Sequence, residues 1–187
     1  QTNLKRLMAY SSIGNMGFAL MGLASGPEHG PSSALIYLAL YLPANIGIFA
    51  LILAMRRNGV AAETVADLAG VAKNRPWMAT AFTLLLFSLA GIPPFIGFIG
   101  KFAVFQAAVS ANLVWLAVVG GIAAVIAAGY YLRLLASIWF QPAGVPLQPA
   151  SGAIVITASL GAALTLALVP VLGVIQQWAE AAAHMLR

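Results

Sequence analysis

Lys101 is the residue whose type and position most directly predict chemistry in this sequence. It is the only charged residue between Arg75 and Arg133, and it lies seven positions after Pro94 in a long apolar stretch. A lysine in the middle of a membrane span costs about 2.5–3.5 kcal/mol on insertion scales, so it is a functional candidate by default. Because burial disfavours the ammonium form, we expect Lys101 to exchange protons near neutral pH. The alternative is a lysine that extends to the membrane surface from a short interfacial helix.

The residues just before Lys101 predict a break in its helix. Gly91, Pro93 and Pro94 lie within a continuous apolar stretch, residues 76–110, which is too long for one simple span. Proline lacks the backbone N–H and clashes with the preceding helical turn. Irregular backbone at membrane depth persists only where it is buried in protein or lines a hydrated cavity. We therefore expect two half-helices that share one crossing, with water beside Lys101, in preference to two short complete spans.

Polar side chains recur at helical spacing in the first two apolar stretches. In the second stretch they are Ser33, Tyr37, Tyr41 and Asn45, every fourth residue. In the first stretch they include Ser11, Ser12 and Asn15. Residues four apart share a helix face, so these groups can line a hydrogen-bonded water chain. Small polar residues in membrane helices more often hold neighbouring helices together, and the residues alone favour that interpretation.

The remaining polar residues predict less chemistry. Lys5 and Arg6 are typical of a positive anchor at the start of a membrane helix. Acidic residues such as Glu63 and Asp67 are interpreted as solvated loop charges, and Tyr130 and Tyr131 as interfacial and packing residues. The sequence has no phosphate-binding loop, nucleophile elbow, haem pair or zinc motif. We expect no metal or cofactor site in this chain, and no direct redox catalysis.

The composition indicates that this chain lies in a membrane. Of 187 residues, 62% are hydrophobic and 7% are charged, against roughly 45–50% apolar and about 25% charged in soluble domains. So few charges cannot cover a soluble fold, and the apolar surface is expected to face the lipid bilayer. The nine basic residues form no patch, which argues against nucleic-acid binding. Without cysteine, the chain cannot form disulfides or thiolate metal sites.

Hydropathy predicts an all-α, polytopic transmembrane helix bundle with one broken helix, in a single membrane domain. The expected helices are 4–23, 32–55, 76–110 broken at 91–94, 114–140 and 153–179. A polar segment, residues 60–75, is expected to form an interfacial loop with a short amphipathic helix. The distribution of lysine and arginine favours an odd number of crossings. The first residues do not resemble a start, so we expect a C-terminal piece of a longer polytopic chain.

Two segments resemble the antiporter-like membrane subunits of respiratory complex I. Residues 1–13, QTNLKRLMAYSSI, are similar to the TNIKRLLAYSSI signature of those subunits, and residues 88–102, SLAGIPPFIGFIGKF, are similar to their broken-helix motif. The resemblance implies the last five of fourteen helices, the C-terminal half of an antiporter-like fold. The second apolar stretch carries Tyr37 and Tyr41 where the L and M types typically have histidine or lysine, which resembles the N type.

The resemblance also implies a function. It indicates proton translocation coupled to electron transfer from NADH to quinone, with this chain as a non-redox subunit of the translocase. NADH, FMN, iron–sulfur clusters and quinone are expected in other subunits. The implied partners are the other membrane-arm subunits and the lipid bilayer, in the bacterial inner (cytoplasmic) membrane or the mitochondrial inner membrane. Two alternatives stay open: a cation/proton antiporter subunit of the Mrp or membrane-bound hydrogenase type, and a non-transporting scaffold.

The family resemblance carries over to individual residues. Lys101 matches the lysine of the broken helix and Lys5 that of the first motif, so both are candidates for proton transfer. Asn15 stands where many bacterial members have histidine. Because asparagine cannot hold a proton near neutral pH, a relay through that position must use water or Tyr and Ser hydroxyls.

Overall fold

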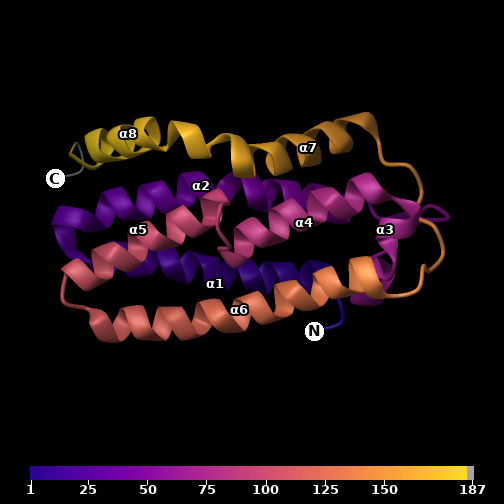
Figure 1. The fold of residues 1–187 in the computed structure, drawn as a ribbon, viewed down its shortest axis with the longest axis horizontal. Coiled ribbons are helices and arrows are strands. Elements are labelled where there is room, and N and C mark those ends of the chain that lie inside the picture. The colour runs from indigo at the N-terminus through magenta and orange to yellow at the C-terminus, as the bar shows by residue number, and fades with distance from the viewer. Residues whose placement is uncertain (185–187) are drawn as a thin grey trace.

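The computed structural model describes residues 1–184, and most of that range is helical. The helices are α1 (Leu4–Ala24), α2 (Gly26–Ala54), α3 (Val71–Asn74), α4 (Pro76–Ala90), α5 (Ile96–Ser110), α6 (Val114–Phe140), α7 (Gly152–Ala167) and α8 (Leu172–His184). Two short strands, β1 (Arg56–Arg57) and β2 (Val60–Ala61), pair antiparallel, and 3₁₀ turns span Val65–Leu68 and Val169–Val171. In Figure 1, α1 and α2 run through the middle of the bundle, α6 lies beyond α1, and α7 and α8 lie beyond α2.

The helix lengths fit a membrane bundle. α1, α2 and α6 are each long and apolar enough to cross a membrane, and α7 together with the segment after it also has the length and composition of a span, with a bend of 54° at the break. α4 and α5 have 15 residues each, which is about 22 Å at 1.5 Å per residue and too short to cross alone. Figure 1 shows them one after the other along the long axis of the bundle. The predicted all-α transmembrane bundle with a broken helix is confirmed.

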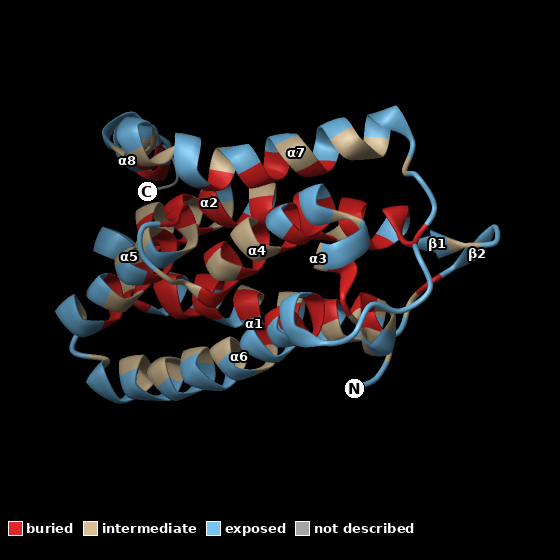
Figure 2. Ribbon diagram, turned by 45° about the vertical axis from the view of Figure 1, so that its right-hand side comes forward, coloured by how far each residue is buried: buried red, intermediate tan, exposed pale blue. Residues whose placement is uncertain are grey.

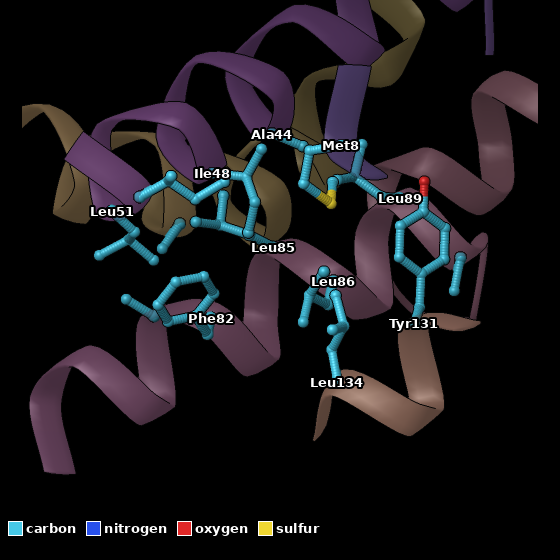
Figure 3. Close-up of a cluster of buried hydrophobic side chains, with 14 of the residues drawn as sticks. Met8, Ala44, Ile48, Leu51, Phe82, Leu85, Leu86, Leu89, Tyr131 and Leu134 are labelled. Atoms are coloured by element: carbon cyan, nitrogen blue, oxygen red, sulfur yellow. The ribbon is translucent and has the colours of Figure 1, made fainter. Parts of the chain in front are cut away.

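The core is centred on α2 and α4. Ile48, Leu51 and Leu85 are completely buried, and Figure 3 shows them meeting between the two helices. In Figure 2 the buried residues face the middle of the bundle, whereas most of α6 is exposed or half-buried. Because lipid tails are as apolar as leucine, such a bundle is held by close packing and hydrogen bonds rather than by exclusion of water.

The backbones of α2 and α7 approach each other closely at a pair of glycines. A Cβ atom added to Gly161 would lie 2.8 Å from the Pro43 carbonyl oxygen and 2.9 Å from Gly47 Cα. Both neighbours are backbone atoms of α2, which cannot rotate away. The two glycines therefore permit the helices to touch, as small residues do at membrane helix interfaces.

We expect Gly161→Ala to separate α7 from α2 and to lower the free energy of unfolding by about 1–3 kcal/mol, as overpacking does. Thermal unfolding in detergent measures the effect. Gly121→Ala in α6 is the matched control, because an added Cβ there meets nothing within 4 Å. Alanine favours a helix by about 0.8–1.0 kcal/mol over glycine, so the control should be neutral or stabilising. Equal stability of the two variants would contradict the close-packing interpretation.

Two predicted helix boundaries are wrong, each because of proline. The second helix begins at Gly26 rather than at residue 32. Pro27 occupies the first turn, where a missing N–H costs no hydrogen bond. The last helix, predicted as continuous over 153–179, is interrupted around Pro170 between α7 and α8. That proline lies in the interior of the predicted helix, where it removes a hydrogen bond and clashes with the preceding turn.

The polar segment after α2 also differs from the prediction. Residues 60–75 were predicted to form an interfacial loop with a short amphipathic helix, and the segment contains the β1–β2 hairpin, a 3₁₀ turn and the four-residue α3. Asp67 is not simply solvated, because it forms an ion pair with Arg57 and accepts hydrogen bonds from the N–H and hydroxyl of Thr64. Arg57 also donates to the Val145 carbonyl, 2.9 Å away. The segment thus joins the ends of distant helices at one face of the bundle.

Candidate functional site

The helix break lies between Ala90, where α4 ends, and Ile96, where α5 begins. Gly91 caps α4 with φ 82°, a left-handed conformation that glycine adopts without steric cost. A Cβ at Gly91 would lie 2.9 Å from Lys101 Cδ, so the lysine also occupies the space that a larger residue would need. Pro93 and Pro94 lie exposed in the connection. The predicted break residues therefore end one half-helix and leave room for the lysine of the next.

Lys101 extends back into this break. Its Nζ donates to the carbonyl oxygens of Leu89 at 2.9 Å and Ala90 at 3.0 Å, and the residue is 7% exposed. These carbonyls belong to the last turn of α4, where no helical N–H can reach them and where the helix dipole favours a cation. Nζ also lies 5.1 Å from the centroid of the Phe18 ring, within cation–π range. The geometry does not fit a lysine that extends to the membrane surface.

Ser88 holds the other side of the break. Its Oγ accepts a hydrogen bond from the Gly97 N–H, 3.2 Å away, in the first turn of α5. A Cβ at Gly97 would lie 1.8 Å from the Ser88 carbonyl oxygen, so only glycine permits this approach. Ser88 was not among the residues predicted for the site. Its only signal was a hydroxyl in an otherwise apolar run three residues before Gly91.

A small cavity lies beside Lys101. The space open to the centre of a water molecule is about 10 Å³, which is roughly the minimum for one water. Its polar lining residues are Asn15, Tyr37, Tyr41, Ser88 and Lys101. Three of the residues predicted for a polar axis therefore meet the predicted proton carrier around one cavity.

Asn15 is the centre of a buried hydrogen-bond cluster. Its Oδ1 accepts from the Tyr37 hydroxyl at 2.9 Å, and its Nδ2 donates to the Ser11 carbonyl at 2.9 Å and to the Tyr131 hydroxyl at 3.2 Å. The Ser11 and Tyr131 hydroxyls also share a hydrogen bond. This cluster ties α1 to α2 and α6.

Tyr131 is a packing residue, as predicted, but it lies in the core and not at the membrane interface. It is completely buried, and its hydroxyl bonds to two residues of α1. Figure 3 shows its ring extending from α6 towards the core. The sequence contains a weak signal of this burial, because Tyr131, Leu134 and Ile138 are spaced to share one apolar helix face. All three are buried in the structure.

A second pair of hydrogen bonds lies one turn further along α2. The Asn45 Oδ1 accepts from the Tyr41 hydroxyl at 2.9 Å and from the Ser12 hydroxyl at 3.1 Å. The Tyr37 and Tyr41 rings are stacked, with centroids 6.0 Å apart. The polar residues predicted along α1 and α2 are thus brought together, and each asparagine accepts a hydrogen bond from a tyrosine of the cavity.

Lys5 lies apart from this cluster, in the first turn of α1, and it does not line the Lys101 cavity. It forms an ion pair with Glu63, which was predicted to be a solvated loop charge. The backbone strengthens the contact, because Leu4 N–H donates to the Glu63 carbonyl and Val65 N–H to the Thr2 carbonyl. The hydrogen bond from Lys5 is the main cause that lowers the pKa of Glu63 below its ordinary value of 4.5.

We expect this ion pair to make stability depend on acid pH. Because the folded-state pKa of Glu63 is depressed, its contribution is present above pH 4.5 and is lost as pH falls through the lower folded-state pKa. Thermal unfolding of the native chain should therefore approach that of a Glu63→Gln variant as the pH is lowered through this range. A constant difference between the two proteins from neutral to acid pH would contradict the expectation.

The described side chains offer no metal site, since no three His, Asp or Glu residues among them lie close enough to hold an ion. The chemistry available is that of one buried amine, several hydroxyls and two amides. Such a set can accept, hold and release a proton.

Comparison with known proteins identifies the family of this chain. Residues 1–127 match the family model described as NADH:quinone oxidoreductase/Mrp antiporter, TM. The chain is 50% identical over 168 residues to NADH-quinone oxidoreductase subunit N of Rhodospirillum rubrum, covering 90% of this chain and 34% of the relative. It is 47% identical over 188 residues to subunit N of Gluconacetobacter diazotrophicus, covering 100% and 39%. The chain thus spans roughly a third of the length of these relatives, whose names agree with the predicted N-type resemblance.

Solved structures share the fold. A chain of respiratory complex I from Thermus thermophilus with bound aureothin superposes with a TM-score of 0.82 at 27% identity, over 95% of this chain and 40% of that chain. A chain of the Mrp complex from a Dietzia species superposes with a TM-score of 0.84 at 21% identity, over 98% and 42%. At that identity, the second likeness concerns the fold alone.

Proposed function

Because this chain belongs to the NADH:quinone oxidoreductase/Mrp antiporter transmembrane family, we propose that it forms part of a proton-translocating membrane subunit of an NADH:quinone oxidoreductase. Lys101 carries the proton, and Tyr37, Tyr41 and Asn15 line the cavity beside it. NADH, FMN, iron–sulfur clusters and quinone bind to other subunits. The partners of the subunit are the other membrane-arm subunits and the lipid of a bacterial inner membrane or a mitochondrial inner membrane.

The observation that carries the proposal is the buried amine held by the end of a broken helix. Two carbonyl oxygens, the dipole of α4 and the Phe18 ring favour the ammonium form of Lys101. Burial opposes that form. Because these effects oppose each other, the protonation equilibrium of Lys101 responds to a distant charge. A unit charge about 10 Å away changes its protonation free energy by roughly 1.7 kcal/mol at an effective dielectric constant of about 20, or more than tenfold in the equilibrium.

The proton transfer itself requires no other titratable side chain in this chain. A lysine ammonium has three N–H groups, and two of them are held by the α4 carbonyls. The third is left for water in the cavity that Lys101 lines. On uptake an O–H bond of a hydronium breaks and an N–H bond forms, and on release the N–H proton returns to water. Charge displacement elsewhere in the complex supplies the bias between the two states.

The test is NADH-driven proton uptake by vesicles that contain the complex with Lys101 replaced. Loss of uptake by an assembled variant supports the proposal. Full uptake with normal assembly contradicts the role of Lys101.

The second candidate function is cation/proton antiport of the Mrp or membrane-bound hydrogenase type. The family description includes Mrp antiporters, whereas the most similar relatives quoted above are named as subunits of an NADH-quinone oxidoreductase. Exchange of sodium for protons by vesicles without NADH, together with the proteins that co-purify, distinguishes the two functions. Sodium-driven exchange without quinone-reducing partners favours the antiporter.

A further inference from the structure

A second, larger pocket reaches α1 one helical turn before the Lys101 cavity. It lies between α1 and α6, and the space that the centres of water molecules can occupy is about 310 Å³. Its lining residues are Gln1, Leu7, Tyr10, Ser11, Val65, Tyr130, Arg133 and Leu134. Ser11 lines this pocket and Asn15, one turn further along α1, lines the Lys101 cavity. The two spaces are therefore separated by about one helical turn and the side chains attached to it.

A continuous chain of hydrogen bonds crosses this separation. It runs from Tyr37 to the Asn15 Oδ1, from the Asn15 Nδ2 to the Tyr131 hydroxyl, and from there to Ser11. The cavity of the proton carrier is thus connected to a pocket of water-accessible size through polar groups alone. Such a chain is either a proton relay or a barrier, and the residue in the middle decides which.

We propose that Asn15, held between Tyr37 and Tyr131, is an insulating link that prevents protons from passing between the Lys101 cavity and the pocket between α1 and α6. The inference rests on the proposed function, since insulation matters only where Lys101 carries protons. Tyr131 is a positioning residue that orients the amide.

The chemistry of the amide supports a barrier. A proton that crossed from Tyr37 to Tyr131 would have to bind to Oδ1 while Nδ2 lost one of its own protons to the Tyr131 hydroxyl. The side chain would be left as an imidic acid, with its C=O and C–N bond orders exchanged. A hydroxyl, a carboxyl or a water molecule that accepts one proton and releases another is left as the same chemical species, whereas a carboxamide is not.

The link is also buried, and its polar groups have protein partners. Asn15 and Ser11 are 4% exposed, Tyr37 is 3% exposed and Tyr131 is completely buried. Every buried side-chain nitrogen and oxygen in the described part of the chain has a hydrogen-bond partner. Buried water typically bonds to polar groups that lack other partners, and each polar group of this cluster already has a protein partner.

The test measures passive proton permeability of vesicles that contain the complete complex, without NADH. We expect Asn15→Asp, which places a proton-accepting carboxyl at the link, to increase the rate at which an imposed pH gradient decays by about tenfold or more. Asn15→Ser is the uncharged second variant, and its hydroxyl should also increase the rate. Because no NADH is used, the result stands whether or not the complex pumps protons through Lys101.

Two controls separate insulation from general damage. Asn45→Asp makes the same chemical change beside Tyr41, but Asn45 adjoins a pocket otherwise lined by apolar residues and Thr157, so the decay rate should not change. Tyr131→Phe removes one acceptor of the amide, but the Asn15 Nδ2 still donates to the Ser11 carbonyl and Asn15 stays in place, so the decay rate should not rise. Unchanged permeability in both Asn15 variants would overturn the proposal, as would an equal leak through Asn45→Asp. Loss of NADH-driven uptake in Tyr131→Phe, with permeability unchanged, would identify the cluster as a relay instead.

Discussion

Vesicles that carry a Lys101→Met variant are expected to lose nearly all proton uptake through this subunit. Methionine has a flexible chain of similar length and no titratable group, so it fills the space beside Gly91 without carrying a proton. Positioned proton carriers contribute about 10²–10⁴-fold to proton-transfer rates, and the residual rate should be on the order of 1% or less of the native rate. NADH-driven acidification, measured with a pH-sensitive dye, gives the result.

The control for this prediction must separate proton transfer from structure. Lys101→Met leaves the carbonyls of Leu89 and Ala90 without their donor, which costs about 1–3 kcal/mol for each buried group. Lys101→Arg keeps a donor for these carbonyls but does not release its proton at physiological pH. An assembled Lys101→Arg variant should therefore also fail to pump. Normal pumping by either assembled variant would favour the scaffold interpretation, in which the lysine only joins the two half-helices.

Gly97→Ala is expected to disrupt the broken helix more than any other single added methyl group in α5. The new Cβ would lie 1.8 Å from the Ser88 carbonyl oxygen, which is a backbone atom in the last turns of α4. Overpacking typically costs about 1–3 kcal/mol, and a contact this short with a backbone atom should reach or exceed the upper value. We expect a lower melting temperature in detergent and a loss of proton uptake, because moving α5 carries Lys101 away from its carbonyl partners.

Gly14→Ala in α1 is the matched control, since an added Cβ at Gly14 meets nothing within 4 Å. It should assemble and pump as the native protein does. If Gly97→Ala were as stable as the control and pumped normally, the close contact between α4 and α5 would not be required for the site.

Some residues of the site could be predicted because their types are unusual for an apolar membrane stretch. Lys101 is charged in an uncharged stretch, and Gly91, Pro93 and Pro94 restrict the backbone through their own covalent structure. Neither property depends on the rest of the fold. The carbonyl partners of Lys101 were not predictable, because every residue has a carbonyl and only the angle between α4 and α5 selects two of them.

The residues that were missed depend on contacts between distant segments. Tyr131 is 120 positions from its partner Ser11, and an adjacent pair of tyrosines in a membrane helix is equally compatible with a position at the membrane surface. Glu63 and Asp67 were interpreted from their polar surroundings in sequence, whereas their ion-pair partners Lys5 and Arg57 belong to other elements. The predicted start of α2 was too late in the sequence, because proline was interpreted as a helix breaker without regard to its position in the first turn.

The uneven burial of α6 has a mechanical consequence. Its buried residues all lie between Tyr131 and Ile138, and none of residues 114–130 is buried within this chain. Within this chain, α6 is therefore held more firmly near its C-terminal end than along residues 114–130, where half-buried residues such as Leu116 and Ala124 pack against the core. Local opening should be easier in residues 114–130, since opening free energies follow local contact density. Tyr131 lies in the more firmly held part, so local opening of residues 114–130 leaves the Asn15–Tyr131 contact undisturbed.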